Sequence, residues 1–319
     1  MTNSFVPSDP AGPGAPSPQP GAVSLAPWLG RLWLAEPRSI DGLEVCPVLL
    51  PGDPGPRYLV AREAAKSGTF EVTEQGGGVV REVIARNHGD VSVLVTDGSS
   101  LMGAKQNRVV VETILVGPRQ EVAIKVGCVE RGRWRPTSAS FDVSPTFVEP
   151  ALRKHTVAQA SARGQVDQVL LWADVERVAC FRGAHSTTDD YHEIVAGHRA
   201  RAEERARAFE PVPDQVGLLA IAGGRLLGFE VFGHPEIWLA LREGLVPSYV
   251  LSAEMGARNV PEAQKGIVAA EWLAALADAR VAVHPARGMG ARLAIDGPDF
   301  AGAGLWADGH AAHLAVFGK

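Results

Sequence analysis

The sequence of 319 residues is poor in cysteine, and its three cysteines, Cys46, Cys128 and Cys180, lie far apart. An odd number of scattered cysteines provides no disulfide framework, and no CxxC pair indicates a zinc site. No apolar run reaches the ~20 residues that a membrane-spanning helix needs. The first residues also lack a basic start followed by an apolar core, so we expect no secretory signal. We therefore expect a cytoplasmic protein with no membrane partner.

Positive charge is also scarce, because the formal net charge is −5 at pH 7. Such a chain has no overall positive field that would gather nucleic acid, so we expect no nucleic-acid partner. The hydrophobic share of 46% is ordinary for a soluble globular protein. A chain of this length can form one large domain or two modest ones. Abundant alanine, glycine, proline and arginine, with little tyrosine and lysine, indicate a GC-rich bacterial genome.

Proline recurs in the first 27 residues, at positions 7, 10, 13, 16, 18 and 20. A segment of proline, glycine, alanine and serine cannot bury enough apolar surface to offset the entropy that is lost on ordering. We therefore expect residues 1–27 to be a disordered tail, with a polyproline ligand as the alternative. The folded part is expected to begin at Trp28.

Residues 28–149 are predicted to be rich in β-strands. Short apolar runs alternate with turn signals such as Asp97-Gly98 and Gly117-Pro118. The expected strands include 43–50, 79–86, 91–95, 106–116 and 121–128. Regular short strands joined by turns favour an antiparallel, sandwich-like unit.

Residues 150–319 combine helical spacing with further strands. Helices are expected at 157–173, 189–209, 235–245, 247–255 and 263–279. Two adjacent glycines, Gly223 and Gly224, predict a tight hairpin turn between strands 216–222 and 225–232. Additional strands are expected at 281–284, 291–296, 302–307 and 311–317. Because the strands are segregated from the helices, we expect an α+β fold in which both parts form one compact unit.

The most informative stretch is residues 101–135, which read LMGAKQNRVVVETILVGPRQEVAIKVGCVERGRWR. Four polar residues, KQNR at 105–108, follow a small Gly-Ala pair. A β-branched run then leads to a second polar cluster, CVERGRWR at 128–135. This pattern indicates a polar site on a β scaffold, and it specifies no reaction.

The segments GAKQNR, TILV at 113–116 and CVERGRW at 128–134 resemble the ARG and rhodanese-phosphatase-superfamily-associated protein domain family, where ARG stands for ADP-ribosylglycohydrolase. The resemblance runs from about Trp28 to the C-terminus and includes HLAVF at 313–317. It implies a link to NAD and ADP-ribose metabolism. One departure follows Asp97-Gly98, where the family pattern has an acidic residue or pair and this chain has Ser99 and Ser100. If those carboxylates act in relatives, this chain lacks that chemistry.

The four residues from Lys105 to Arg108 suit a nucleotide-like ligand. On a strand, Lys105 and Asn107 would face one way, and Gln106 and Arg108 the other. Asparagine and glutamine amides both donate and accept hydrogen bonds, which suits a ribose or a base edge. Lysine and arginine suit phosphate, arginine in a bidentate manner. The alternative is a hydrogen-bond network that ties this strand to its neighbours.

The second polar cluster supplies candidate catalytic and anion-binding groups. Nearby arginines would activate Cys128 as a nucleophile, whereas a small buried hydrophobic residue is the alternative. Glu130 is a candidate general base, or else the partner of an arginine in an ion pair. Arg133 and Trp134 are candidates for clamping an anion and stacking an aromatic ring. A plug in or beside the core is the alternative role for Trp134.

Two further candidates lie outside this cluster. Asp97 is a candidate for handling protons, but we expect no metal there, because the neighbouring hydroxyls lack the charge that a hard cation needs. Arg292 follows a Gly-rich turn, GMG at 288–290, whose backbone amides suit an anion. An ordinary turn before a strand is the alternative.

Together these observations favour a bacterial cytoplasmic α+β protein that binds a nucleotide-type small molecule, such as ADP-ribose or a derivative. The expected partner is a small polar or phosphorylated metabolite, and the sequence identifies no cofactor and no metal site. The alternative is a non-catalytic interaction or scaffold module in which KQNR and CVERGRW are structural. A homo-oligomer paired through a sheet edge is compatible with the sequence, which carries no specific signal for it.

Overall fold

The computed structural model describes residue 23 and residues 25–76, 81–256 and 269–319. Most of the predicted tail, residues 1–27, therefore lies outside the described residues. The end of that segment differs from the prediction, because Leu25–Leu29 form helix α1. Helix α1 packs against helix α7 (Ala269–Ala277) in a shared apolar cluster. Among the described residues, regular structure therefore extends ahead of Trp28, to Leu25.

Six antiparallel strands close into a barrel in the order β11-β6-β5-β12-β8-β9. The strands are β5 (Phe70–Glu74), β6 (Glu82–Asn87), β8 (Ser99–Gly103), β9 (Arg108–Val110), β11 (Glu121–Cys128) and β12 (Ser140–Phe147). A three-stranded sheet of β4 (Leu59–Val60), β7 (Val93–Val95) and β10 (Ile114–Val116) shares the apolar core of the barrel. Strand β6 alternates buried and half-buried residues, as a strand with one face on a core does. The predicted β-rich unit therefore closes into a barrel rather than a sandwich.

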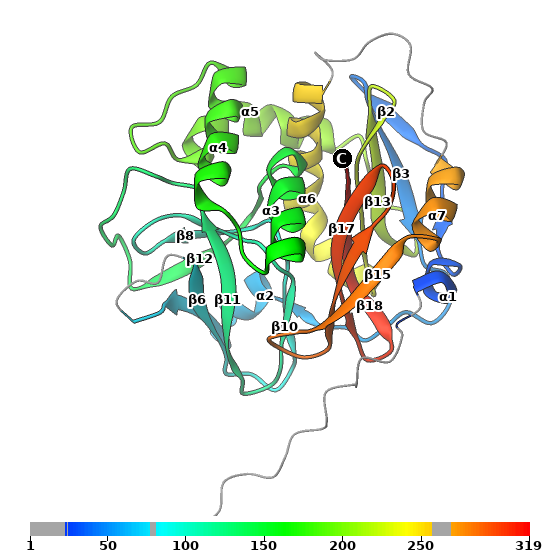
Figure 1. Ribbon diagram of the computed structural model, residues 1–319, viewed down its shortest axis with the longest axis horizontal. Helices are drawn as coiled ribbons and strands as arrows, with labels where there is room; N and C mark the ends of the chain where they lie inside the picture. The colour runs from blue at the N-terminus through cyan, green and yellow to red at the C-terminus, as the bar shows by residue number, and fades with distance from the viewer. Residues whose placement is uncertain (1–22, 24, 77–80, 257–268) are drawn as a thin grey trace, which may run out of the picture.

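The second β unit is a nine-stranded sheet in the order β1-β3-β13-β14-β18-β17-β16-β15, with β2 paired to β3 (Figure 1). Its strands are β1 (Trp33–Leu34), β2 (Arg38–Ile40), β3 (Leu43–Leu49), β13 (Gln215–Ala222), β14 (Arg225–Phe232), β15 (Arg280–Pro285), β16 (Ala291–Asp296), β17 (Phe300–Ala307) and β18 (His310–Gly318). Strand β3 pairs antiparallel with β13, so the first strands of the folded chain join the C-terminal sheet. The α+β class is confirmed.

The predicted hairpin turn at Gly223-Gly224 forms, and Asp308-Gly309 makes a second hairpin turn in this sheet. Gly223 and Gly224 have φ angles of 56° and 71°, and Asp308 and Gly309 have φ angles of 51° and 79°. Two consecutive residues with positive φ give the type I′ geometry whose twist matches that of paired strands. Glycine and aspartate adopt this region more readily than other residues, which is why the sequence located these turns.

The remaining described helices pack on the barrel, on the large sheet or on one another. They are α2 (Ala61–Lys66), α3 (Pro150–Arg163), α4 (Gln168–Arg182), α5 (Tyr191–Ala206) and α6 (Pro235–Gly256). Helix α6 packs on β13 and β14 and also on β12 of the barrel, whereas α3 packs on β17 and β18 (Figure 1). Within the described ranges, no helix combines the length and apolar character needed to cross a membrane.

Two helix predictions were wrong. The helix expected at 157–173 is interrupted, because Gly164 takes a left-handed conformation with φ 70° and ends α3. Asp167 then caps α4 by accepting hydrogen bonds from two backbone amides of its first turn. The helices expected at 235–245 and 247–255 are instead one helix, α6, with Pro247 inside it. Burial of α6 between the barrel and the sheet outweighs the cost of the proline, about 3 kcal/mol. Part of the helix expected at 263–279 lies outside the described residues.

The strand expected at 106–116 was also wrong, because it forms two strands. Lys105, Gln106 and Asn107 lie in the turn before β9, so they do not alternate along a strand. Strand β9 pairs with β11 in the barrel, whereas β10 pairs with β7. The chain leaves β9 where Glu112 binds Lys125 at 2.9 Å and Thr113 Oγ1 donates to the carboxylate of Asp97. Polar side-chain contacts thus break the apolar run.

Candidate functional site

The KQNR segment forms a tight turn between β8 and β9. Gly103 and Ala104 have φ angles of 105° and 44°, which reverse the chain direction at the end of β8. The backbone N–H of Gly103 donates to Asn107 Oδ1 at 2.9 Å and closes the turn. The small residues before KQNR therefore serve the turn, because larger side chains rarely adopt positive φ.

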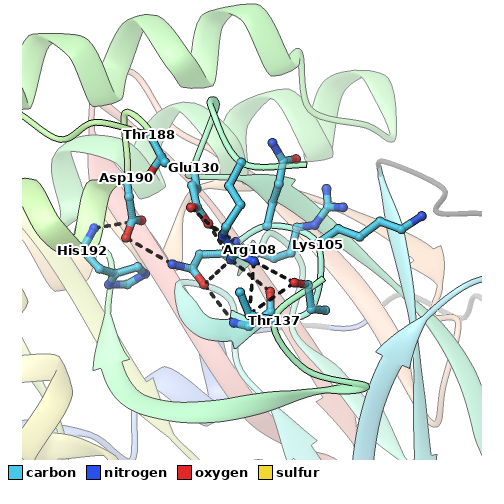
Figure 2. Close-up of polar contacts among 12 residues, drawn as sticks. Lys105, Arg108, Glu130, Thr137, Thr188, Asp190 and His192 are labelled. Atoms are coloured by element: carbon cyan, nitrogen blue, oxygen red, sulfur yellow. Dashed lines mark hydrogen bonds and ion pairs between the residues drawn. The ribbon is translucent and has the colours of Figure 1, made fainter. Parts of the chain in front are cut away.

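Arg133 fixes this turn to the end of β11. Its Nε and Nη2 donate to the two oxygens of Glu130, each at 2.7 Å. Its Nη1 donates to the carbonyl oxygen of Ala104 at 2.7 Å and to Thr137 Oγ1 at 3.2 Å (Figure 2). A bidentate arginine–carboxylate pair has a defined geometry, so this contact holds the loop rigidly.

Asn107 and Asp190 complete the group, and we call Asn107, Glu130, Arg133 and Asp190 the Arg133 cluster. The Asn107 backbone N–H donates to Glu130 Oε2 at 2.9 Å, and its Nδ2 donates to Asp190 Oδ2 at 3.1 Å. Asp190 also caps α5, because its Oδ1 accepts from the backbone N–H of His192 at 3.2 Å (Figure 2). The cluster therefore joins the barrel to the first turn of α5.

The acids in this cluster lie in a desolvated environment. Burial raises the pKa of Asp190 to about 6, against the lowering effect of its hydrogen bonds, and the nearby Glu130 also raises this pKa. The neighbouring His192 is buried as well, and burial lowers its pKa to about 3. A carboxyl group with a pKa near neutrality can exchange a proton under cellular conditions.

We predict that Asp190→Asn changes the pH dependence of stability. The folded-state pKa of Asp190 lies above the ordinary aspartate value of 3.8, so the folded chain holds this proton more tightly. The contribution of Asp190 to stability therefore falls as pH rises from 3.8 to about 6. The variant is expected to gain up to about 3 kcal/mol in unfolding free energy relative to the wild type between pH 4 and pH 7.

Urea denaturation at several pH values measures this effect. Asp167→Asn is a matched control, because Asp167 also caps a helix but its side chain is only partly buried. A difference between Asp190→Asn and wild type that stays constant from pH 4 to pH 7 contradicts the prediction.

Arg108 and Cys128 face the interior of the molecule. The fully buried guanidinium of Arg108 donates to Cys128 Sγ and lies 3.6 Å from Glu74. Burial raises the pKa of the Cys128 thiol to about 11, despite the opposing effect of Arg108. Since the thiolate is the nucleophile, this direction favours the structural role for Cys128 over the catalytic one. Gln106 is buried too, and its Nε2 donates to the carbonyl oxygen of Arg131 at 3.2 Å.

Two cation–aromatic pairs border the Arg133 cluster on the outside, and we call Lys105, Arg131, Trp134 and Trp172 the aromatic rim. Lys105 Nζ lies 5.8 Å from the ring centre of Trp134, and Arg131 Cζ lies 5.3 Å from that of Trp172. Trp134 is 53% exposed, so its side chain does not fill a position within the core. Lys105 extends away from the cluster (Figure 2). The rim thus combines positive charge with an accessible indole ring.

Asp97 lies in a different cluster. Its carboxylate accepts from Arg153 at 2.9 and 3.2 Å, and Arg153 also binds both oxygens of Glu230 at 2.7 Å. His313 Nε2 lies 3.1 Å from Glu230 Oε1, and its Nδ1 lies 3.4 Å from Asp97 Oδ1. We call Asp97, Arg153, Glu230 and His313 the buried quartet. It joins the barrel, α3 and the large sheet.

Sequence reasoning assigned no role to three members of the quartet. A signal was available for two of them, because Glu230 and His313 interrupt the apolar runs GFEVF and HLAVF. Charged residues inside buried strands are rarely unpaired. Arg153 stands in a polar helix, PALRKHTVAQASAR, where nothing in the sequence distinguishes it from a solvated arginine.

Arg292 occupies a third location. Its Nε lies 4.0 Å from Glu112 Oε2, and it lines a narrow cavity together with Asp97 and Thr113. The structure therefore brings Asn107, Glu130 and Arg133 into one hydrogen-bonded group. Asp97 and Arg292 line a different place, the narrow cavity beside Thr113. Among the described residues, no group of three or more histidine, cysteine or acidic side chains is placed to hold a metal ion.

Comparison with known proteins gives one result at the level of the family. No curated protein and no solved structure matches the chain. The model of the ARG and Rhodanese-Phosphatase-superfamily-associated Protein domain matches residues 31–317, which include both β units and all the clusters described above. The resemblance seen in the sequence is thereby confirmed, and the chain belongs to this family.

Proposed function

We propose that the chain binds a nucleotide-type small molecule, such as ADP-ribose or a derivative, at the aromatic rim. The observation that carries the proposal is the exposed Trp134 with Lys105 beside it, both next to the Arg133 cluster. The family description supports it, because it associates these domains with ADP-ribosylglycohydrolases. Catalysis is not part of the proposal.

The chemistry of the rim suits such a ligand. A base can stack on the indole of Trp134, and stacking of a base on an aromatic side chain contributes about 1–3 kcal/mol. Lys105 and Arg131 supply positive charge for phosphate groups. Arg133 contacts the carbonyl oxygens of Ala104 and Arg135, so the segments that carry the rim residues are held in place before the ligand arrives. A preorganised site loses less entropy on binding.

We predict that Trp134→Ala weakens binding of ADP-ribose by about tenfold or more, because it removes the stacking surface. A thermal-shift screen of the intact chain against ADP-ribose, AMP, NAD and a sugar phosphate measures this effect. A ligand at one hundred times its Kd is expected to raise the Tm on the order of 5 °C. The variant is expected to show a much smaller rise at the same ligand concentration.

Trp33→Ala is the matched control, because Trp33 is also an exposed tryptophan, 67% accessible, but lies on β1 of the large sheet. It is expected to leave the ligand-induced rise unchanged. If the ligand-induced rise in Tm falls equally in both variants, the rise does not depend on binding at the aromatic rim.

One observation favours a second candidate function, a non-catalytic interaction module. Asn107, Glu130 and Arg133 bind one another, as a structural network requires. Ser99 and Ser100, which replace the acidic residues of the family pattern, are both buried. For this function, a nucleotide screen of the folded protein gives no shift, and the exposed rim instead takes part in a contact with another macromolecule.

A further inference from the structure

A wide cleft borders helix α3, and several charged residues line it. Its volume is about 880 Å³. Its walls are α3, the end of α6, the turn between β13 and β14, part of α4, and the C-terminal end of β18. The titratable residues in its lining are Lys154, His155, Arg177, Arg225, Asp299 and Lys319.

Positive charge dominates this lining. Three of its four cationic side chains come from α3, α4 and β14, and the fourth is Lys319 after β18, whereas Asp299 has the one carboxylate side chain among the described lining residues. A cleft lined mainly by one sign of charge concentrates the field and attracts ions of the opposite sign. The net charge of the whole chain is −5, so this concentration of cations runs against the overall balance.

One wall of the cleft is held by a buried carboxylate. Asp174 in α4 accepts from His155 Nδ1 at 2.8 Å and from Arg177 Nη2 at 2.6 Å. Its side chain is buried, whereas His155 and Arg177 reach the cleft. Since Nδ1 of His155 faces Asp174, its Nε2 edge points away from that carboxylate. Asp174 thus orients a ring nitrogen and a guanidinium at the cleft wall.

Lys154 and Lys319 also line the cleft. Lys319 Nζ donates to Asp296 at 2.9 Å and to the carbonyl oxygen of Gly297 at 2.6 Å, so its charge is largely balanced by Asp296. Lys154, half-buried on α3, is the lysine placed to reach a ligand in the cleft. Its ammonium acts on an anion as a point charge with three donors.

We infer that this cleft binds a small phosphate-bearing molecule, with Lys154, Arg177 and Arg225 facing its phosphate groups. The cleft volume of about 880 Å³ lies within the range of about 300–1,000 Å³ that is usual for small-molecule sites, so a small molecule with more than one phosphate fits. The site is separate from the aromatic rim and does not depend on the function proposed there.

Calorimetric titration of the intact chain with inorganic pyrophosphate, at an ionic strength of about 0.15 M, tests this inference. Saturable binding is expected in the wild type, and Lys154→Ala is expected to weaken it by about tenfold. Lys66→Ala is the matched control, because Lys66 is an exposed lysine on α2 outside the cleft. Circular dichroism establishes that both variants are folded like the wild type.

Three outcomes overturn the inference. Absence of saturable heat in the wild type shows that the cleft takes no phosphate-bearing ligand. Equal weakening by Lys154→Ala and Lys66→Ala shows general charge attraction instead of a site. Loss of pyrophosphate binding in Trp134→Ala places the anion at the aromatic rim. Unchanged binding in Trp134→Ala, together with weakening in Lys154→Ala, supports the cleft.

Discussion

Replacement of Arg153 by methionine is expected to lower the free energy of unfolding by about 3–5 kcal/mol. The guanidinium of Arg153 is fully buried and binds the carboxylates of Asp97 and Glu230. Methionine fills similar space but leaves two buried acids without their cation. The expected loss comes from these uncompensated charges, because a well-packed apolar group itself is tolerated in a core.

The pKa of Glu230 supports this expectation. Burial alone would raise it, but the Arg153 guanidinium and the hydrogen bond with His313 outweigh burial and hold it at about 2. A carboxyl group whose folded-state pKa is lowered stabilises the protein above its unfolded pKa, and this contribution is lost as pH falls toward 2. Without Arg153, that source of stability at neutral pH is absent.

Urea denaturation at pH 7 measures the Arg153→Met effect. Arg57→Met is the control, since Arg57 forms an exposed ion pair with Glu236 and exposed pairs contribute about 0–1 kcal/mol. Combining Arg153→Met with Glu230→Gln is expected to restore part of the loss, because one buried charge is then removed. An Arg153→Met variant as stable as Arg57→Met would show that the buried quartet does not stabilise the contact between the barrel and the large sheet.

The second large effect is expected at Gly244 in helix α6. A Cβ atom there would overlap the carbonyl oxygen of Pro145 in β12, so the helix touches the barrel backbone at this point. Gly244→Ala is expected to lower the unfolding free energy by about 3 kcal/mol, because helix or strand must move. Helix propensity alone predicts the opposite sign, a gain of about 1 kcal/mol.

Gly197→Ala in helix α5 separates these two effects. An added Cβ at Gly197 meets nothing within 4 Å, so only the helix propensity changes. We expect this control to be stabilising and Gly244→Ala to be destabilising in the same thermal and urea measurements. Stabilisation by both substitutions would mean that α6 and β12 are not in close contact.

Local signals in the sequence predicted the elements whose geometry depends on a few neighbouring residues. The Gly223-Gly224 turn and the strand at 121–128 are examples, since positive φ and β-branched runs act locally. Closure of the barrel was not predictable in this way, because it depends on pairing between strands distant in the chain, such as β12 with β5. The expected helix at 157–173 is broken at Gly164, which takes a left-handed conformation. The helical spacing of the apolar residues around it did not predict this conformation.

The candidate site shows the same limit. The sequence named Asn107, Glu130 and Arg133 as candidates, and the structure adds Asp190, which binds the side chain of Asn107. Asp190 comes from the start of α5, so no local pattern could connect it to residue 107. Likewise, Gly98 was predicted as a turn residue, but its close approach to Arg153 depends on how α3 packs against the barrel.

Calorimetric titration of the intact wild-type chain with ADP-ribose tests the central proposal most directly, with Trp134→Ala and Trp33→Ala titrated under the same conditions. The account predicts saturable binding in the wild type and in Trp33→Ala, and binding about tenfold or more weaker in Trp134→Ala. Absence of binding by folded wild-type protein, or equal affinity in Trp134→Ala, would contradict it.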